Sequence, residues 1–194
     1  WPNISKSTEP NSMAERIVIT AMGICSALGD NLEEHLAGLL SGQSGLSVVE
    51  NVYTLHRDHI RVGELKHTND FLAQQLGLPV VNHYSRTGLL GIWALKEAIA
   101  QAGLTPTEVA QLSMVMASSV GGMDMTERYF YEYTTQEALR RYIPYHNIGE
   151  VTGQIADYFG IKGYVTSVST ACSSSANAIL TAANLLRTGR AQRI

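Results

Sequence analysis

Cys172 is the side chain in this sequence that is best placed to act as a nucleophile. It follows the β-branched stretch at residues 166–168 and precedes an alanine-rich stretch that predicts a helix from Ser173. A thiol at such a strand-to-helix turn lies near free backbone N–H groups and the positive end of the helix dipole. These groups favour the thiolate, which is the nucleophilic form, and they could also hold the oxyanion of an attacked carbonyl.

The surroundings of Cys172 favour catalysis but do not supply a base. Its neighbours are small and rich in hydroxyl groups, which leaves room for a substrate carbonyl. A cysteine nucleophile normally needs a base or an orienting partner. His146 is the candidate in the same half of the sequence, and no spacing fixes it near Cys172. From the residues alone, Cys172 is either a catalytic nucleophile or an inert buried thiol, and a cysteine hydrolase would need a base that the sequence does not show.

Composition narrows the class of protein. The chain has 194 residues, of which 45% are apolar and 16% charged, so it can bury a core as one domain or part of one. The net charge of −3 offers no basic field for nucleic acid, and no apolar run has membrane-spanning length. We therefore expect neither a nucleic-acid nor a membrane partner. The first 12 residues lack the apolar centre of a signal peptide and are expected to be a disordered arm or expression remnant before a natural start at Met13.

The second cysteine, Cys25, lies in a loop of small apolar residues and is expected to pack as a small hydrophobe. The two cysteines are far apart and have no metal-binding spacing, which favours two reduced thiols in a cytoplasmic protein. The histidines His56, His59 and His67 also lack such spacing and are expected to be solvated loop residues.

The order of apolar runs predicts an α/β fold. Fully apolar strands that alternate with helices indicate a sheet covered on both faces. Buried strands are expected at residues 16–22, 112–117 and 164–168, with short strands at 48–49 and 60–63. Helices are expected at residues 31–40, 85–102, 125–139, 148–159 and 173–187, and a capped helix start at Thr105. The aromatic residues of the 125–139 helix are expected to form core or a subunit interface.

The stretch Thr170-Ala171-Cys172-Ser173-Ser174-Ser175-Ala176 resembles the active-site cysteine motif of the β-ketoacyl-[acyl-carrier-protein] synthases. These are the elongating condensing enzymes of the thiolase fold. The family's opening strand, early glycine turn, glycine pair and helix before the cysteine strand have counterparts at residues 16–23, 44–45, 121–122 and 149–160. Inactive lookalike subunits replace the cysteine that this chain keeps.

The resemblance implies a layered thiolase-like fold, with a mixed sheet and helices on both faces, and an acyltransferase of fatty acid or polyketide/aryl-polyene biosynthesis. Cys172 would accept an acyl group from acyl carrier protein as a thioester, with its own N–H in the oxyanion hole. Malonyl-carrier protein would then lose carbon dioxide, and its carbanion would attack the thioester to give the β-ketoacyl product. Neither a cofactor nor a metal is implied.

The resemblance also implies a substrate pocket and a subunit partner. The pocket residues would be Val120, Gly121, Gly122, Tyr142 and Ile143. The last two match a segment that reaches the partner's pocket floor, so a homodimer or a synthase heterodimer is expected. Paired glycines after a strand form a tight turn and permit close backbone approach, while the absence of a P-loop lysine excludes a phosphate loop.

Members of the family are longer, with two similar βαβ halves, and their catalytic histidines and lysine lie in the second half. Residues 13–194 are therefore expected to be the N-terminal half of a synthase domain, and we hypothesise that this chain alone cannot condense. The alternative is a non-catalytic or decarboxylating partner subunit. Asn177 and Tyr164 depart from the usual His and Pro, and only His83 and Arg86 remain near residues 76–84 for docking acidic carrier protein.

Overall fold

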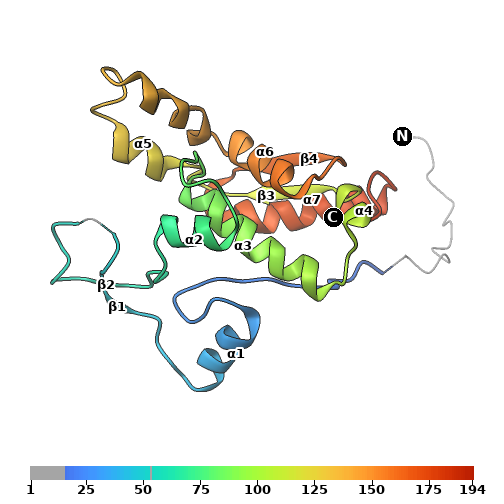
Figure 1. The fold of residues 1–194 in the computed structure, drawn as a ribbon. Helices are drawn as coiled ribbons and strands as arrows, with labels where there is room; N and C mark the ends of the chain where they lie inside the picture. Colours follow the sequence, from blue (N-terminus) through green and yellow to red (C-terminus); the bar gives the residue numbers. More distant parts are fainter. Residues whose placement is uncertain (1–15, 53) are drawn as a thin grey trace, which may run out of the picture.

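A parallel pair of strands leads into both turns that the sequence marks as functional (Figure 1). The computed structural model describes residues 16–52 and 54–194, so the predicted arm at residues 1–12 and the start at Met13 lie outside the described residues. In chain order the helices and strands are α1 (Leu32–Leu40), β1 (Ser47–Val48), β2 (Arg61–Val62), α2 (Asn69–Gln75), α3 (Arg86–Gln101), α4 (Pro106–Ala110), β3 (Met114–Ala117), α5 (Met123–Tyr129), the 3₁₀ helices η1 (Glu137–Tyr142) and η2 (Pro144–His146), α6 (Ile148–Phe159), β4 (Val165–Val168), the 3₁₀ helix η3 (Ala171–Ser173) and α7 (Ser174–Arg187).

Helices cover both faces of the β3–β4 pair. The strands run parallel, with Met114 opposite Val165 and Ala117 opposite Val168. Met116 packs against the cluster that α3 and α6 build, whereas Val115 lies beside α7 residues. Because neighbouring residues of a strand point to opposite faces, α6 and α7 lie on opposite sides of the sheet. The predicted α/β layering is confirmed.

The core that supports this sheet lies between α2, α3 and α6. Leu72, Leu89, Ile92 and Val151 are at most 1% exposed. Burying each of these aliphatic side chains stabilises the fold by about 1.5–3 kcal/mol. Of the described helices, none is long and apolar enough to cross a membrane.

Helix ends follow the capping signals of the sequence. The side chains of Asn31 and Ser85 accept N–H bonds at the starts of α1 and α3. Thr105 and Glu108 form a reciprocal capping box at α4. Gly160 ends α6 in the left-handed region, with a φ of 68°. The boundaries predicted for these helices are therefore confirmed to within a residue or two at the capped ends.

The strand predicted at residues 16–22 is wrong for this structure. The segment has no ladder partner among the described residues, and Val18 and Ile19 are 68% and 80% exposed. The N–H of Met22 instead donates to Oε1 of Gln101 at 2.7 Å. A β-branched run forms a strand only where a neighbouring strand completes its hydrogen bonds, and the segment lies beside a helix here.

The single helix predicted at residues 125–139 is also wrong, because α5 ends at Tyr129 and the chain resumes in η1. Aromatic and β-branched residues such as Tyr133 and Thr134 are poor helix formers, and they occupy the break. The helix α2, at Asn69–Gln75, was not predicted.

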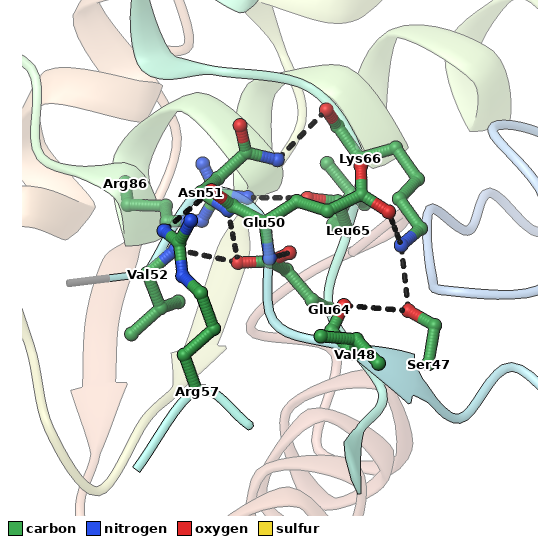
Figure 2. Close-up of polar contacts among 10 residues, drawn as sticks. All are labelled: Ser47, Val48, Glu50, Asn51, Val52, Arg57, Glu64, Leu65, Lys66 and Arg86. Carbon is green, nitrogen blue, oxygen red and sulfur yellow. Dashed lines mark hydrogen bonds and ion pairs between the residues drawn. The ribbon is translucent and has the colours of Figure 1, made fainter. Parts of the chain in front are cut away.

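A buried carboxylate organises the loop that follows β1 (Figure 2). Glu64, only 5% exposed, accepts N–H bonds of 2.8, 2.9 and 2.6 Å from Glu50, Asn51 and Val52. Burial alone would raise the pKa of Glu64, but these three donors and the nearby Lys66 outweigh it, so the pKa lies below its ordinary value.

One of the predicted solvated histidines is in fact a structural residue. His67 is half-buried, its Nε2 lies 2.5 Å from Oδ2 of Asp30, and its ring stacks on Phe71 with centroids 4.3 Å apart. His56 and His59 are exposed loop residues, as predicted.

Candidate active site

The parallel pairing of β3 and β4 brings two turns to the same edge of the sheet. Residues 118–122 follow the carboxyl end of β3, and residues 169–173 follow that of β4. Ligands of α/β proteins bind at this edge, outside the carboxyl ends of the strands. The predicted glycine pair and the predicted nucleophile therefore lie at one end of the sheet.

Cys172 lies on the exposed crest of its turn, between β4 and α7. The residue before it, Ala171, has a φ of 51° and is the one non-glycine residue with positive φ in the described part of the chain. A left-handed conformation costs an L-residue about 1–2 kcal/mol, so the surrounding structure must hold it. This bend separates the strand from the helix and lifts the thiol away from the core.

Hydroxyl groups hold the bend. The Ser174 hydroxyl, in a residue only 4% exposed, accepts the N–H of Thr170 at 2.9 Å and donates to the carbonyl of Ala171 at 2.7 Å. The Ser173 hydroxyl donates to the Thr170 carbonyl at 2.8 Å, and Nδ2 of Asn177 donates to Oγ1 of Thr170 at 2.8 Å. The hydroxyl-rich surround predicted to line a substrate space is thus in part a brace for the turn.

The backbone N–H of Cys172 does not take part in these hydrogen bonds. No acceptor for it is found within residues 16–52 and 54–194, whereas the next N–H, of Ser173, donates to the Thr170 carbonyl at 3.2 Å. The following helix, α7, has 14 residues, and no side chain caps its N-terminus. A free N–H beside an exposed thiol is the arrangement that the oxyanion of an attacked carbonyl requires.

The glycine pair is required by the chain's own backbone. Gly121 has a φ of 55°, and a Cβ there would lie 2.3 Å from the carbonyl oxygen of His146. A Cβ on Gly122 would lie 2.0 Å from the carbonyl oxygen of Tyr145. The glycine pair therefore lets the backbone of residues 145–146 approach closely. A pocket role for both glycines stays a prediction.

Of the other predicted pocket residues, Val120 is 50% exposed on the same turn, with its N–H bonded to the Ser118 hydroxyl at 3.2 Å. Tyr142 and Ile143 lie apart from it, in a pocket of about 120 Å³ between α5 and η1. The structure thus divides the five predicted residues between the turn after β3 and this second pocket.

The second pocket has aromatic walls. The rings of Tyr129 and Tyr142 stack with centroids 4.8 Å apart, and burial raises the pKa of Tyr129. The other lining residues that the sequence did not single out as pocket residues are Met125, Thr126, Phe130, Tyr133 and Leu139. The recurrence of aromatic residues at 129–133 is the sequence feature that could have indicated this pocket, but the same pattern predicts core or a subunit interface.

No base reaches Cys172 in the described residues. Nδ1 of His146 lies 3.0 Å from Oγ1 of Thr126, and no described histidine hydrogen-bonds Cys172. Residues 16–52 and 54–194 contain no group of three or more His, Cys, Asp or Glu side chains that could hold a metal ion.

Comparisons with known proteins agree on one family. The family model described as beta-ketoacyl synthase, N-terminal domain, matches residues 14–194. The chain is 29% identical over 198 residues to the chloroplastic 3-oxoacyl-[acyl-carrier-protein] synthase II of Arabidopsis thaliana. This match covers 94% of this chain and 35% of that protein. It is also 29% identical over 180 residues to the tetracenomycin polyketide synthase ketoacyl synthase beta subunit of Streptomyces glaucescens, covering 89% of this chain and 43% of that protein. The chain spans less than half the length of these relatives.

Solved structures share the fold. The ishigamide ketosynthase/chain length factor superposes with a TM-score of 0.73 at 22% identity, over 90% of this chain and 44% of that one. The ketosynthase ApeO in complex with its chain length factor ApeC, from Xenorhabdus doucetiae, superposes with a TM-score of 0.64 at 23% identity, over 89% of this chain and 44% of that one. These likenesses confirm the predicted thiolase-like α/β fold.

Proposed function

Because the chain belongs to the β-ketoacyl synthase family, as its N-terminal domain, we propose that it carries the acyl-accepting nucleophile of a β-ketoacyl-[acyl-carrier-protein] synthase. The observation that supports this most is the placement of Cys172. Its thiol is exposed at the carboxyl end of a parallel strand, beside its own free N–H and the start of α7.

In the first transfer, the Cys172 thiolate attacks the carbonyl carbon of an acyl-carrier-protein thioester. A carbon–sulfur bond forms, and the negative charge moves to the carbonyl oxygen, which the N–H of Cys172 stabilises. When this intermediate collapses, the bond to the carrier's sulfur breaks and the carrier leaves as its thiolate. The acyl group then remains on Cys172 as a thioester.

In the second transfer, malonyl-carrier protein loses carbon dioxide and leaves a carbanion. The carbanion attacks the Cys172 thioester, a carbon–carbon bond forms, and Cys172 leaves as its thiolate. The product is a β-ketoacyl-carrier protein, and the free enzyme is regenerated. The decarboxylation needs groups beyond those that the Cys172 turn provides.

The proposal extends to a partner and a pocket. Carrier protein would present the acyl thioester at the sheet edge where Val120, Gly121, Gly122 and Cys172 lie. The aromatic pocket with Tyr142 and Ile143 would serve a substrate chain or a second synthase subunit, in a homodimer or heterodimer in the cytoplasm. Exposed aromatic side chains favour such a contact, because Phe130, which lines the pocket, is 55% exposed and the adjacent Tyr131 is 84% exposed.

Acyl loading tests the proposed function. The chain is incubated with hexanoyl-carrier protein, and the acylated residue is located by peptide mass spectrometry. We expect the acyl mass on the peptide that contains Cys172, with loss of loading in Cys172→Ala and full loading in Cys25→Ala. An unmodified Cys172 peptide under these conditions would contradict the proposal.

A second candidate is the non-catalytic partner subunit of a synthase pair. The match to a ketoacyl synthase beta subunit favours it. The retained Cys172 disfavours it, because an exposed thiol on a braced turn has no evident use in a subunit without acyl transfer. This candidate predicts no acyl group on Cys172 and tight association with a separate ketosynthase subunit in size-exclusion chromatography.

A further inference from the structure

The left-handed conformation of Ala171 aims the peptide unit that bears the Cys172 N–H. A peptide N–H takes its direction from the dihedral angles of the residue before it. Ala171 has a φ of 51°, and the N–H of Cys172 has no acceptor among the described residues. Relaxation of Ala171 to an ordinary helical or extended conformation would turn this N–H elsewhere.

One side chain connects both ends of the strained residue. The Ser174 hydroxyl takes the N–H of Thr170, on one side of Ala171, and gives its proton to the carbonyl of Ala171 on the other. Its hydrogen bonds, of 2.9 and 2.7 Å, lie in a residue that is 4% exposed, so water does not replace either bond easily. The hydroxyl therefore spans the bend as a clamp.

The other polar side chains of the turn do not bond the main chain on both sides of Ala171. The Ser173 hydroxyl donates to Thr170, and Nδ2 of Asn177 donates to two side-chain oxygens, Oγ1 of Thr170 at 2.8 Å and Oγ of Ser173 at 3.3 Å. The exposed Ser175 side chain makes no hydrogen bond among the described residues. Ser174 is thus the side chain of this turn that bonds main-chain groups on both sides of the Ala171 Cα, the N–H of Thr170 and the carbonyl of Ala171.

We propose that Ser174 is a positioning residue for acyl transfer, whose hydroxyl holds Ala171 left-handed and so keeps the Cys172 N–H aimed at the oxyanion of the attacked thioester. This inference rests on the proposed acyl transfer to Cys172. Ser174 acts through the backbone and does not touch the reacting atoms.

Two reactions of the same sulfur separate positioning from general integrity. Alkylation by iodoacetamide needs the thiolate but develops no oxyanion, whereas acyl transfer from a thioester needs both the thiolate and the N–H. A lost oxyanion donor should therefore slow acylation far more than alkylation.

The experiment measures both rates at Cys172 in the wild-type chain, in Ser174→Ala, in Ser174→Thr, which keeps a hydroxyl, and in Ser175→Ala as the matched control. We expect Ser174→Ala to slow acylation by about 10²-fold, as loss of one oxyanion donor does, and alkylation by no more than about threefold. Ser174→Thr should restore most of the acylation rate, and Ser175→Ala should leave both rates unchanged.

A second variant tests the link to backbone strain. Glycine adopts a positive φ without penalty, so Ser174→Ala should lower the melting temperature less in an Ala171→Gly background than in the wild-type background. If Ser174→Ala alone fails to fold, a cooperative melting transition in the Ala171→Gly/Ser174→Ala chain supports the link, and a double variant that also fails to fold overturns it.

Normal acylation of a folded Ser174→Ala chain, or equal slowing of both reactions, would overturn the positioning role while leaving acyl transfer to Cys172 intact. Equal melting shifts in the two backgrounds would overturn the link to Ala171. An absence of acylation in the wild-type chain would instead remove the proposed function.

Discussion

The two cysteines of this chain show how different the surroundings of the same side chain can be. Cys25 is half-buried beside α3, and its thiol donates to the carbonyl of Leu90 at 3.8 Å. Burial raises the pKa of Cys25, and the charges of Asp30 and Glu97 raise it further against the lowering effect of Arg86. Cys172 is exposed on a strained and clamped turn, where the hydrogen bonds around it come from hydroxyl and amide groups and involve no carboxylate.

This difference indicates which features of a cysteine turn matter for chemistry. Both thiols have small neighbours, so size does not distinguish them. Exposure, the charge of nearby groups and a free N–H distinguish them. The first two affect how easily the thiolate forms, and the free N–H stabilises the negative charge on the oxygen of the attacked carbonyl. The sequence-based prediction of Cys25 as a small packed hydrophobe agrees with its half-buried, hydrogen-bonded place.

Of the variants considered, Gly23→Ala should change the difference in reactivity between Cys25 and Cys172 the most. A Cβ on Gly23 would lie 1.9 Å from the carbonyl oxygen of Ala94, so the segment before Cys25 must move away from α3. We expect a loss of about 2–3 kcal/mol in the free energy of unfolding, as overpacking typically costs. Cys25 should then react with iodoacetamide at least about tenfold faster, because its thiol loses its burial.

The control for this variant lies within the same molecule. The rate at Cys172 should stay within about twofold of the wild-type rate, since the atoms nearest a Cβ on Gly23 belong to Ala94 and Ala98 of α3 and not to the α7 turn. Urea unfolding and site-resolved alkylation would measure the two effects. A Cys25 rate unchanged by a destabilising Gly23→Ala would show that burial does not suppress its reactivity.

A smaller effect, seen in acid, should distinguish the loop held by Glu64 from the turn that carries Cys172. Glu64 has a lowered pKa, so its carboxylate contributes stability that is fully present above about pH 4.5 and is lost as the pH falls through its folded-state pKa. Between pH 5 and 3, the amides of residues 50–52 should therefore lose protection from hydrogen exchange. The amides of Thr170 and Ser173, whose acceptors are a hydroxyl and a carbonyl group, should not.

Glu64→Gln sharpens this prediction, because an amide keeps one acceptor oxygen and replaces the other with a donor. We expect a cost of about 1–3 kcal/mol at pH 7 and no further acid-dependent loss at residues 50–52. The matched control is Glu50→Gln, whose carboxylate forms an exposed ion pair with Lys66. An acid-dependent loss that persists in Glu64→Gln would assign the effect to another carboxyl.

The sequence was informative where the determining contacts are local. Caps at Asn31, Ser85 and Gly160 depend on groups within a few residues, and so did the strand-to-helix turn at Cys172. The sequence was misleading at residues 16–22, because a strand exists only with a partner strand, which no local pattern can report.

The candidate site was predicted in its nucleophile but not in its geometry. The motif identified Cys172 and the resemblance supplied the role of its N–H. The clamp by Ser174 could not be predicted, because it depends on the φ of Ala171 and on two distances. Tyr142 and Ile143 were predicted as pocket residues, but the aromatic wall opposite them was not, because a break after Tyr129 folds η1 back onto α5.

The most direct test of the account is the ratio of alkylation rates at the two cysteines in the folded wild-type chain. Both rates are followed by peptide mass spectrometry at pH 7, with free N-acetylcysteine as the reference thiol. The account predicts that Cys172 reacts faster than the reference and at least about tenfold faster than Cys25. A Cys172 that reacts no faster than the reference thiol, or no faster than Cys25, would contradict an activated nucleophile at this turn.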